Sequence, residues 1–122
     1  MKRVNRSGTV LVRKETEMKK KILIVDDEMK VRRMYSSLLK SEGYRVFSAS
    51  SAVEADDILG KRKIDLVLLD INMPEIDGSL LHQVMDTFHK NAKIIVCSVR
   101  PLDDQRKLID NAADYYDKSQ GI

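Results

Sequence analysis

The sequence predicts an α/β domain in which helices cover both faces of a parallel, five-stranded sheet. Five short apolar runs alternate with segments of helical periodicity, and all of them fall within 122 residues. A chain of that length forms one domain. Because strands that alternate with helices build parallel βαβ units with right-handed crossovers, we expect a doubly wound sheet.

The elements follow from their periodicity. ILIVD is a continuous apolar run, as in a strand covered on both faces. Apolar residues then recur at helical spacing, and Gly43 supplies the left-handed residue that ends this first helix. The pair Ser51 and Glu54 predicts a capping box for a second helix, which Gly60 would end. We expect strands over 22–26, 44–49, 65–70, 93–98 and 114–116, with later helices over 80–88 and 102–112.

The composition is that of an ordinary globular domain, with 43% hydrophobic and 34% charged residues. The apolar runs are too short to span a membrane, and the N-terminus lacks the apolar stretch of a signal peptide. The single cysteine, Cys97, excludes a disulfide framework and favours a reducing, cytoplasmic setting.

Positive charge is concentrated at the N-terminus. Residues 1–21 have a net charge of +6, whereas the whole chain has +3. We expect 1–18 to be a basic, poorly ordered extension and 19–122 to be the folded domain. Such an arm can also touch nucleic acid, but no motif indicates nucleic-acid binding within this chain.

Polar residues end several of the expected strands. In open parallel sheets the ligand site lies at the carboxyl ends of the strands. Asp26 and Asp27 end the first strand, Asp70 the third and Ser98 the fourth, while Lys118 follows the fifth. Each residue alone could be a helix cap or a turn residue. Those readings do not explain why five polar groups converge on one edge.

The chemistry of this set points to phosphoryl transfer. Neighbouring carboxylates repel one another unless a cation lies between them, and hard oxygen ligands suit Mg²⁺. Lys118 adds a positive charge and Ser98 a hydroxyl. A carboxylate nucleophile beside a divalent metal, a lysine and a hydroxyl can accept a phosphoryl group.

Four motifs, ILIVDDE, LVLLDINMPEIDG, IIVCS and ADYYDKS, occur in the order seen in one known family. Residues 19 to about 120 resemble the receiver domain of two-component response regulators. The resemblance implies the flavodoxin-like strand order 2-1-3-4-5. It also implies that the fifth helix of the family is missing, because the sequence stops at Ile122, where that helix should begin.

The resemblance implies a role for each matching residue. Asp70 would be the phosphoacceptor, receiving its phosphoryl group from a sensor histidine kinase or a phosphotransfer protein. Asp27 would bind Mg²⁺ directly and Asp26 largely through water, with Asp70 and the backbone carbonyl of Asn72 completing the ligands. Ser98 would be the switch hydroxyl and Tyr115 the switch aromatic residue. Lys118 would be the salt-bridging lysine, and Pro74 and Gly78 would shape the loop.

The sequence departs from the family pattern at several points. Ser119 replaces the proline that usually follows the lysine, and Val99 replaces a small residue after the switch hydroxyl. The spacing from Ser98 to Lys118 is also about two residues shorter than usual.

Two function classes stay open. The first is a phosphorylation-controlled switch, and the second is an interaction module with a receiver fold that works without phosphorylation. We expect a signalling domain with self-catalysed phosphoryl transfer and autodephosphorylation, not an enzyme acting on diffusible substrates. Without a fifth helix, one sheet face would stay half bare, so a homodimer that covers it is a further expectation.

Overall fold

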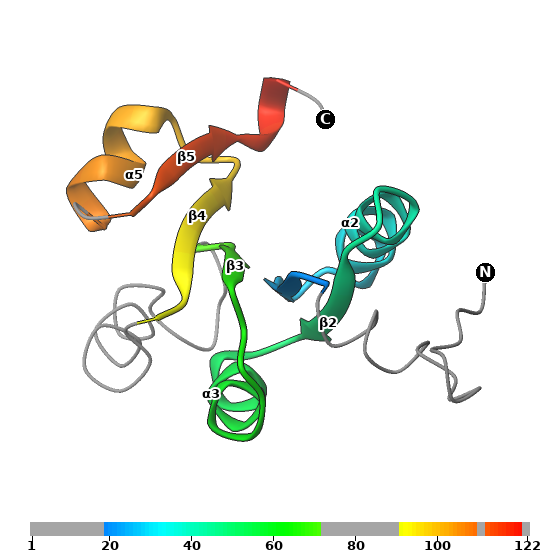
Figure 1. Cartoon of the computed structure of the whole chain (residues 1–122). Helices are drawn as coiled ribbons and strands as arrows, with labels where there is room; N and C mark the ends of the chain where they lie inside the picture. The colour runs from blue at the N-terminus through cyan, green and yellow to red at the C-terminus, as the bar shows by residue number, and fades with distance from the viewer. Residues whose placement is uncertain (1–18, 72–90, 110–111, 121–122) are drawn as a thin grey trace, which may run out of the picture.

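The computed structural model describes residues 19–71, 91–109 and 112–120 (Figure 1). Its parallel sheet has five strands in the order β2-β1-β3-β4-β5, which confirms the predicted fold class and strand order. The strand limits agree closely with those expected from the sequence. The strands are β1 (Lys21–Val25), β2 (Arg45–Ala49), β3 (Leu66–Leu69), β4 (Lys93–Ser98) and β5 (Asp114–Asp117).

The described helices are α2 (Met29–Ser41), α3 (Ala52–Lys61), α5 (Leu102–Leu108) and the 3-10 turn η1 (Lys118–Gln120). Gly43 follows α2 with a φ of 94°, so the expected left-handed residue is confirmed. The Oγ atom of Ser51 accepts a hydrogen bond of 3.2 Å from the backbone N–H of Glu54, as a capping residue should. Gly60 does not end α3, because the helix continues to Lys61.

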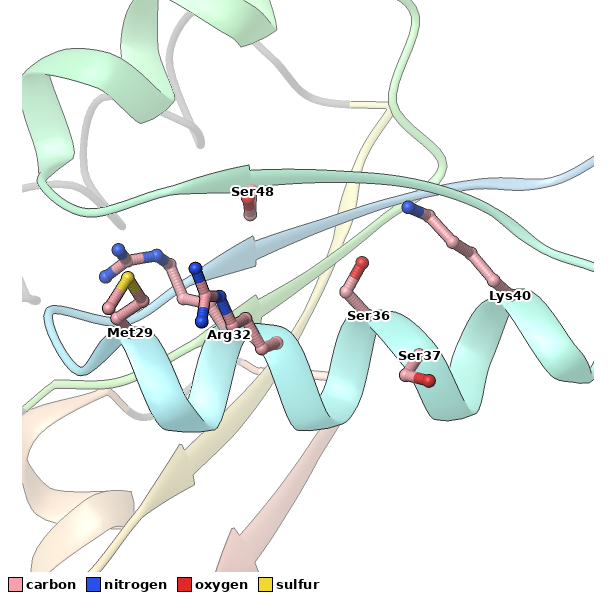
Figure 2. A pocket seen from close by; sticks show the side chains of 7 residues that line it. Met29, Arg32, Ser36, Ser37, Lys40 and Ser48 are labelled. Carbon is pink, nitrogen blue, oxygen red and sulfur yellow. The ribbon is translucent and has the colours of Figure 1, made fainter.

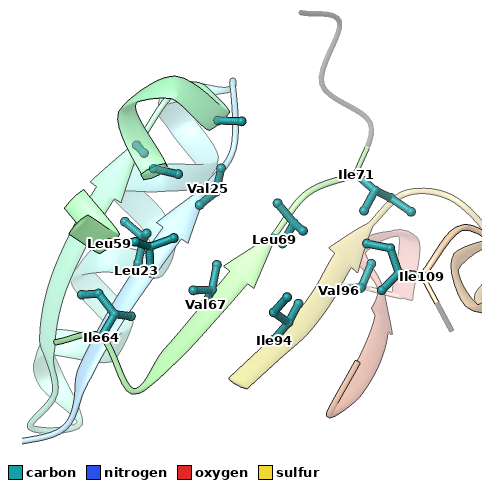
Figure 3. Close-up of a cluster of buried hydrophobic side chains, with 13 residues drawn as sticks. Leu23, Val25, Leu59, Ile64, Val67, Leu69, Ile71, Ile94, Val96 and Ile109 are labelled. Carbon is teal, nitrogen blue, oxygen red and sulfur yellow. The ribbon is translucent and has the colours of Figure 1, made fainter. Parts of the chain in front are cut away.

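The larger core cluster lies on the sheet face that α3 covers (Figure 3). Its central strand residues are fully buried, and three residues of α3 pack onto them. Figure 1 shows α3 and α5 on this side of the sheet and α2 on the other. The strand residues of this cluster are Leu23, Val25, Ala49, Val67, Leu69, Ile94 and Val96.

The opposite face is less well covered. In the described ranges α2 is the helix that packs there, and Ile24 lies buried beneath it. Farther along the sheet Leu66, Leu68 and Ile95 are only half-buried, and they line an open hollow together with Leu39 and Tyr44. Five strands span about 19 Å and one helix about 10 Å, so α2 alone leaves part of this face open.

After β5, the described residues form only the short turn η1. Within the described residues no α-helix follows β5, as expected. None of the described helices has the length and apolar composition needed to cross a membrane. The expected extension 1–18 and the helix expected over 80–88 lie outside the described residues.

Candidate functional site

Three carboxylates meet at the carboxyl edge of the sheet. Val25 and Leu69, the last residues of β1 and β3, are partners in the parallel register, so Asp26 and Asp70 leave the sheet side by side. Ligand atoms of Asp26, Asp27 and Asp70 all lie within 4.8 Å of one another. Asp26 is 2% exposed and Asp70 5%, whereas Asp27 is exposed to solvent. The expected convergence of these three acidic residues is therefore present.

Lys118 reaches into the same cluster from the end of β5. Its Nζ atom lies 2.5 Å from Oδ2 of Asp26 and 3.3 Å from Oδ2 of Asp70. Burial lowers the pKa of Lys118, but the hydrogen bond to Asp26 and the charges of both aspartates outweigh it, so the pKa is raised overall. Lys118 is therefore an ammonium group. One ammonium against three carboxylates leaves the cluster net negative, as a cation site requires.

Asp26 is also fixed by its own loop. Its Oδ1 atom accepts a hydrogen bond of 2.9 Å from the backbone N–H of Glu28, and its carbonyl accepts one of 2.8 Å from Nη1 of Arg32. Both oxygens of this carboxylate are thus engaged, one by Glu28 and the other by Lys118. The carboxylate is held in place at the start of α2.

Ser98 lies at the same edge, at the end of β4. It is fully buried, and it pairs in register with Asp117, the residue before Lys118. Its Oγ atom accepts a hydrogen bond of 3.3 Å from the backbone N–H of Arg100. Because a hydroxyl can accept and donate at once, Ser98 can still donate its proton to another acceptor.

The expected switch aromatic, Tyr115, is turned toward the loop after α5. Its hydroxyl donates a hydrogen bond of 2.6 Å to the carbonyl of Ile109 and accepts one of 3.2 Å from the backbone N–H of Ala112. The ring packs against the larger core cluster, and the guanidinium carbon of Arg106 lies 5.4 Å from the ring centroid. The side chain is half-buried in this position.

Gln105 is a residue that the sequence reasoning missed. It is fully buried, and its Nε2 atom donates to the carbonyls of Arg100 at 2.8 Å, Tyr116 at 2.9 Å and Ser98 at 3.3 Å. One amide thus joins the end of β4, the loop after it and β5. Its position four residues before Ile109, an apolar residue on the buried side, was the signal that could have revealed it.

The remaining expected site residues, Asn72, Pro74 and Gly78, lie outside the described residues. The donor set that is described consists of carboxylate oxygens only, two from nearly buried residues and one from an exposed residue. Such hard oxygen donors, with one open side, fit Mg²⁺ better than a soft or tetrahedrally bound metal.

The comparison with known proteins agrees with this geometry. The family model described as the response regulator receiver domain matches residues 22–120. The chain is 38% identical over 79 residues to sporulation initiation phosphotransferase F of Bacillus subtilis, covering 65% of this chain and 64% of that protein. It is 40% identical over 83 residues to the chemotaxis protein CheY of Treponema pallidum, covering 64% of this chain and 56% of that protein. The match therefore spans less than two thirds of either relative.

Among solved structures, the fold is similar to that of the response regulator protein TrrA from Thermotoga maritima, which was crystallised in complex with Mg(2+)-BeF. The TM-score is 0.75 at 33% identity, and the match covers 84% of this chain and 89% of that chain.

Proposed function

Because this chain belongs to the response regulator receiver domains, a family of signalling domains, we propose that it is a phosphorylation switch with Asp70 as the phosphoacceptor. The observation that carries this proposal is the cluster of three carboxylates around the ammonium group of Lys118. Like charges held this close are unfavourable unless a cation joins them. A module that served only as a scaffold would have no need for such a cluster.

The residues present fit a bound Mg²⁺. Asp26, Asp27 and Asp70 would hold it, and the backbone carbonyl of Asn72 would be a fourth protein ligand. The ion would supply positive charge beside the phosphoryl group that is transferred.

In the proposed reaction a carboxylate oxygen of Asp70 attacks the phosphorus of a phosphohistidine. The new O–P bond forms as the P–N bond breaks, and the imidazole leaves with the electron pair of that bond. The ammonium of Lys118, now 3.3 Å from Asp70, neutralises charge on the transferring group. Ser98 donates its hydroxyl proton in a hydrogen bond to a phosphoryl oxygen.

The phosphodonor would be a sensor histidine kinase or a phosphotransfer protein. Tyr115 would change its position with Ser98 and so carry the signal to the surface. Loss of the phosphoryl group would occur by self-catalysed hydrolysis at the same site. The cytoplasmic setting, which the single cysteine suggested, stays a prediction.

A second candidate role rests on the partly open face beside α2. Leu66, Leu68 and Ile95 are half-buried there, and exposed apolar surface favours association. This face would support a homodimer, or an interaction module that needs no phosphorylation.

The test is the intact mass of the protein after incubation with a small-molecule phosphodonor and Mg²⁺. We expect the mass to increase by one phosphoryl group, and to stay unchanged when EDTA is present. Asp70→Asn should abolish the increase. Asp65→Asn is the matched control, because Asp65 precedes β3 at the opposite end of the strand and accepts from the N–H of Lys21. Unaltered labelling of Asp70→Asn would disprove the assignment.

A further inference from the structure

A polar hollow lies between α2 and β2, the strand at the edge of the sheet (Figure 2). It measures about 490 Å³ and is open to solvent. None of its lining residues belongs to the carboxylate cluster. The lining consists of Met29, Arg32, Arg33, Ser36, Ser37, Lys40 and Ser48.

The lining is positively charged. Its described residues supply two guanidinium groups and one ammonium group, and no carboxylate. In the part of the chain that the structure describes, neither Arg33 nor Lys40 forms an ion pair. Arg32 is held at one end by its 2.8 Å hydrogen bond to the carbonyl of Asp26. Two cationic side chains thus line the hollow with no counter-charge from the described residues in contact.

Hydroxyl groups complete the lining. Figure 2 shows Ser36 and Lys40 reaching from α2 toward β2, while Ser48 points back toward the helix. Serine hydroxyls, ammonium and guanidinium groups are donors that bind phosphate oxygens. The same donors gathered around one hollow therefore favour an anion rich in oxygen acceptors.

We propose that this hollow binds a small oligophosphate, such as the diphosphate part of a nucleotide. Arg33 and Lys40 are seven residues apart, which corresponds to about 10 Å along a helix axis. A ligand with two or more phosphates can engage both, each through a separate phosphate group. None of the described lining residues is an aromatic one on which a base could stack, so recognition rests on phosphate and not on nucleic-acid bases.

The site is independent of phosphoryl transfer at Asp70. Without a divalent cation, the carboxylate cluster repels an anion, so an oligophosphate should not bind there. Inorganic pyrophosphate in magnesium-free buffer is thus a probe that avoids the carboxylate cluster. The proposal can be tested separately from the proposed function, because Asp70→Asn should leave pyrophosphate binding unchanged.

The experiment is a titration of the chain with pyrophosphate, followed by calorimetry and by backbone amide NMR shifts. We expect saturable one-to-one binding, with the largest shifts at the hollow. Arg33→Ala and Lys40→Ala should each weaken binding about tenfold, as the loss of one charge-assisted hydrogen bond would do. Lys30→Ala is the matched control, since Lys30 is exposed on the same helix but does not line the hollow, and it should bind like the original chain.

Three results would overturn the proposal. The first is an equal loss of binding in Lys30→Ala, which would show attraction to the overall charge of α2. The second is orthophosphate binding as tightly as pyrophosphate, which would exclude engagement of both ends. The third is tighter binding of a single-stranded oligonucleotide, with displacement of pyrophosphate. That result would identify a nucleic-acid backbone as the ligand.

Discussion

Lys118 and Asp26 are 92 residues apart in the sequence, yet the ammonium nitrogen of one lies 2.5 Å from a carboxylate oxygen of the other. The contact joins the end of β5 to the end of β1, two strands that are separated by β3 and β4. Both side chains are largely buried, with 11% and 3% of their surface exposed. Lys118 thus balances charge that would otherwise be repulsive inside the protein.

Lys118→Met should therefore destabilise the fold. Removing one partner of a buried ion pair leaves uncompensated charge and costs about 3 kcal/mol or more. The free energy of unfolding, measured in urea without divalent cations, should fall by that amount. Lys61→Met is the matched control, because the pair of Lys61 with Asp57 is mostly exposed and should change stability very little. Equal effects of the two substitutions would contradict a buried role for Lys118.

The same contact predicts a dependence on alkaline pH. The pKa of Lys118 in the folded protein is raised above its ordinary value of 10.5. Its stabilising contribution should be complete below that value and should be lost as the pH rises through the raised pKa. Lys118→Met should lack this part of the alkaline loss, as urea unfolding at a series of pH values would measure.

Gln105 should position the loop that carries Ser98. Gln105→Met keeps an unbranched side chain but leaves the carbonyls of Ser98, Arg100 and Tyr116 without this donor. We expect a loss of about 2 kcal/mol in stability. Affinity for beryllofluoride in the presence of Mg²⁺ should fall severalfold, because the backbone of Ser98 and Arg100 loses the amide that anchors it. The affinity for Mg²⁺ alone should stay constant, since the carboxylates do not contact this amide.

Lys107→Met, an exposed substitution on the same helix, is the control for Gln105→Met. It should change neither affinity. If Gln105→Met lowered stability yet bound beryllofluoride like the original chain, Gln105 would be a structural residue only.

Val99 should control the lifetime of the phosphorylated form. Its side chain follows Ser98 directly and is 57% exposed, so it lies at the surface beside the site. A branched side chain there should hinder the approach of hydrolytic water. Val99→Ala should consequently lose its phosphoryl group faster, as a time course of intact mass would show. An unchanged or slower decay would mean that water access at this position is not limiting.

The open face beside α2 should make the chain self-associate or bind hydrophobic dye. Leu68→Ser combined with Ile95→Ser should weaken either behaviour, because both half-buried side chains line the hollow on that face. Val53→Ser is the control, since Val53 is 73% exposed on α3, away from this face. Light scattering and dye fluorescence provide the measurements. A monomer that does not bind the dye would show that this face is covered.

The sequence by itself determined the features that depend on local periodicity. Continuous apolar runs that alternate with helical segments predicted the strand limits closely. Gly43 predicted the end of α2, because glycine adopts a positive φ without strain. The positions of Asp26 and Asp70 at strand ends also followed, since the carboxyl ends of parallel strands share one edge.

Only the tertiary structure decided which distant groups meet. The three carbonyls bound by Gln105, the contact of Lys118 with Asp26 and the hollow shared by α2 and Ser48 all join different elements of the chain. Periodicity reports which face of an element is buried, but not what that face touches. Those contacts depend on the crossovers, the register and the twist of the assembled sheet, and these form only when the whole chain packs.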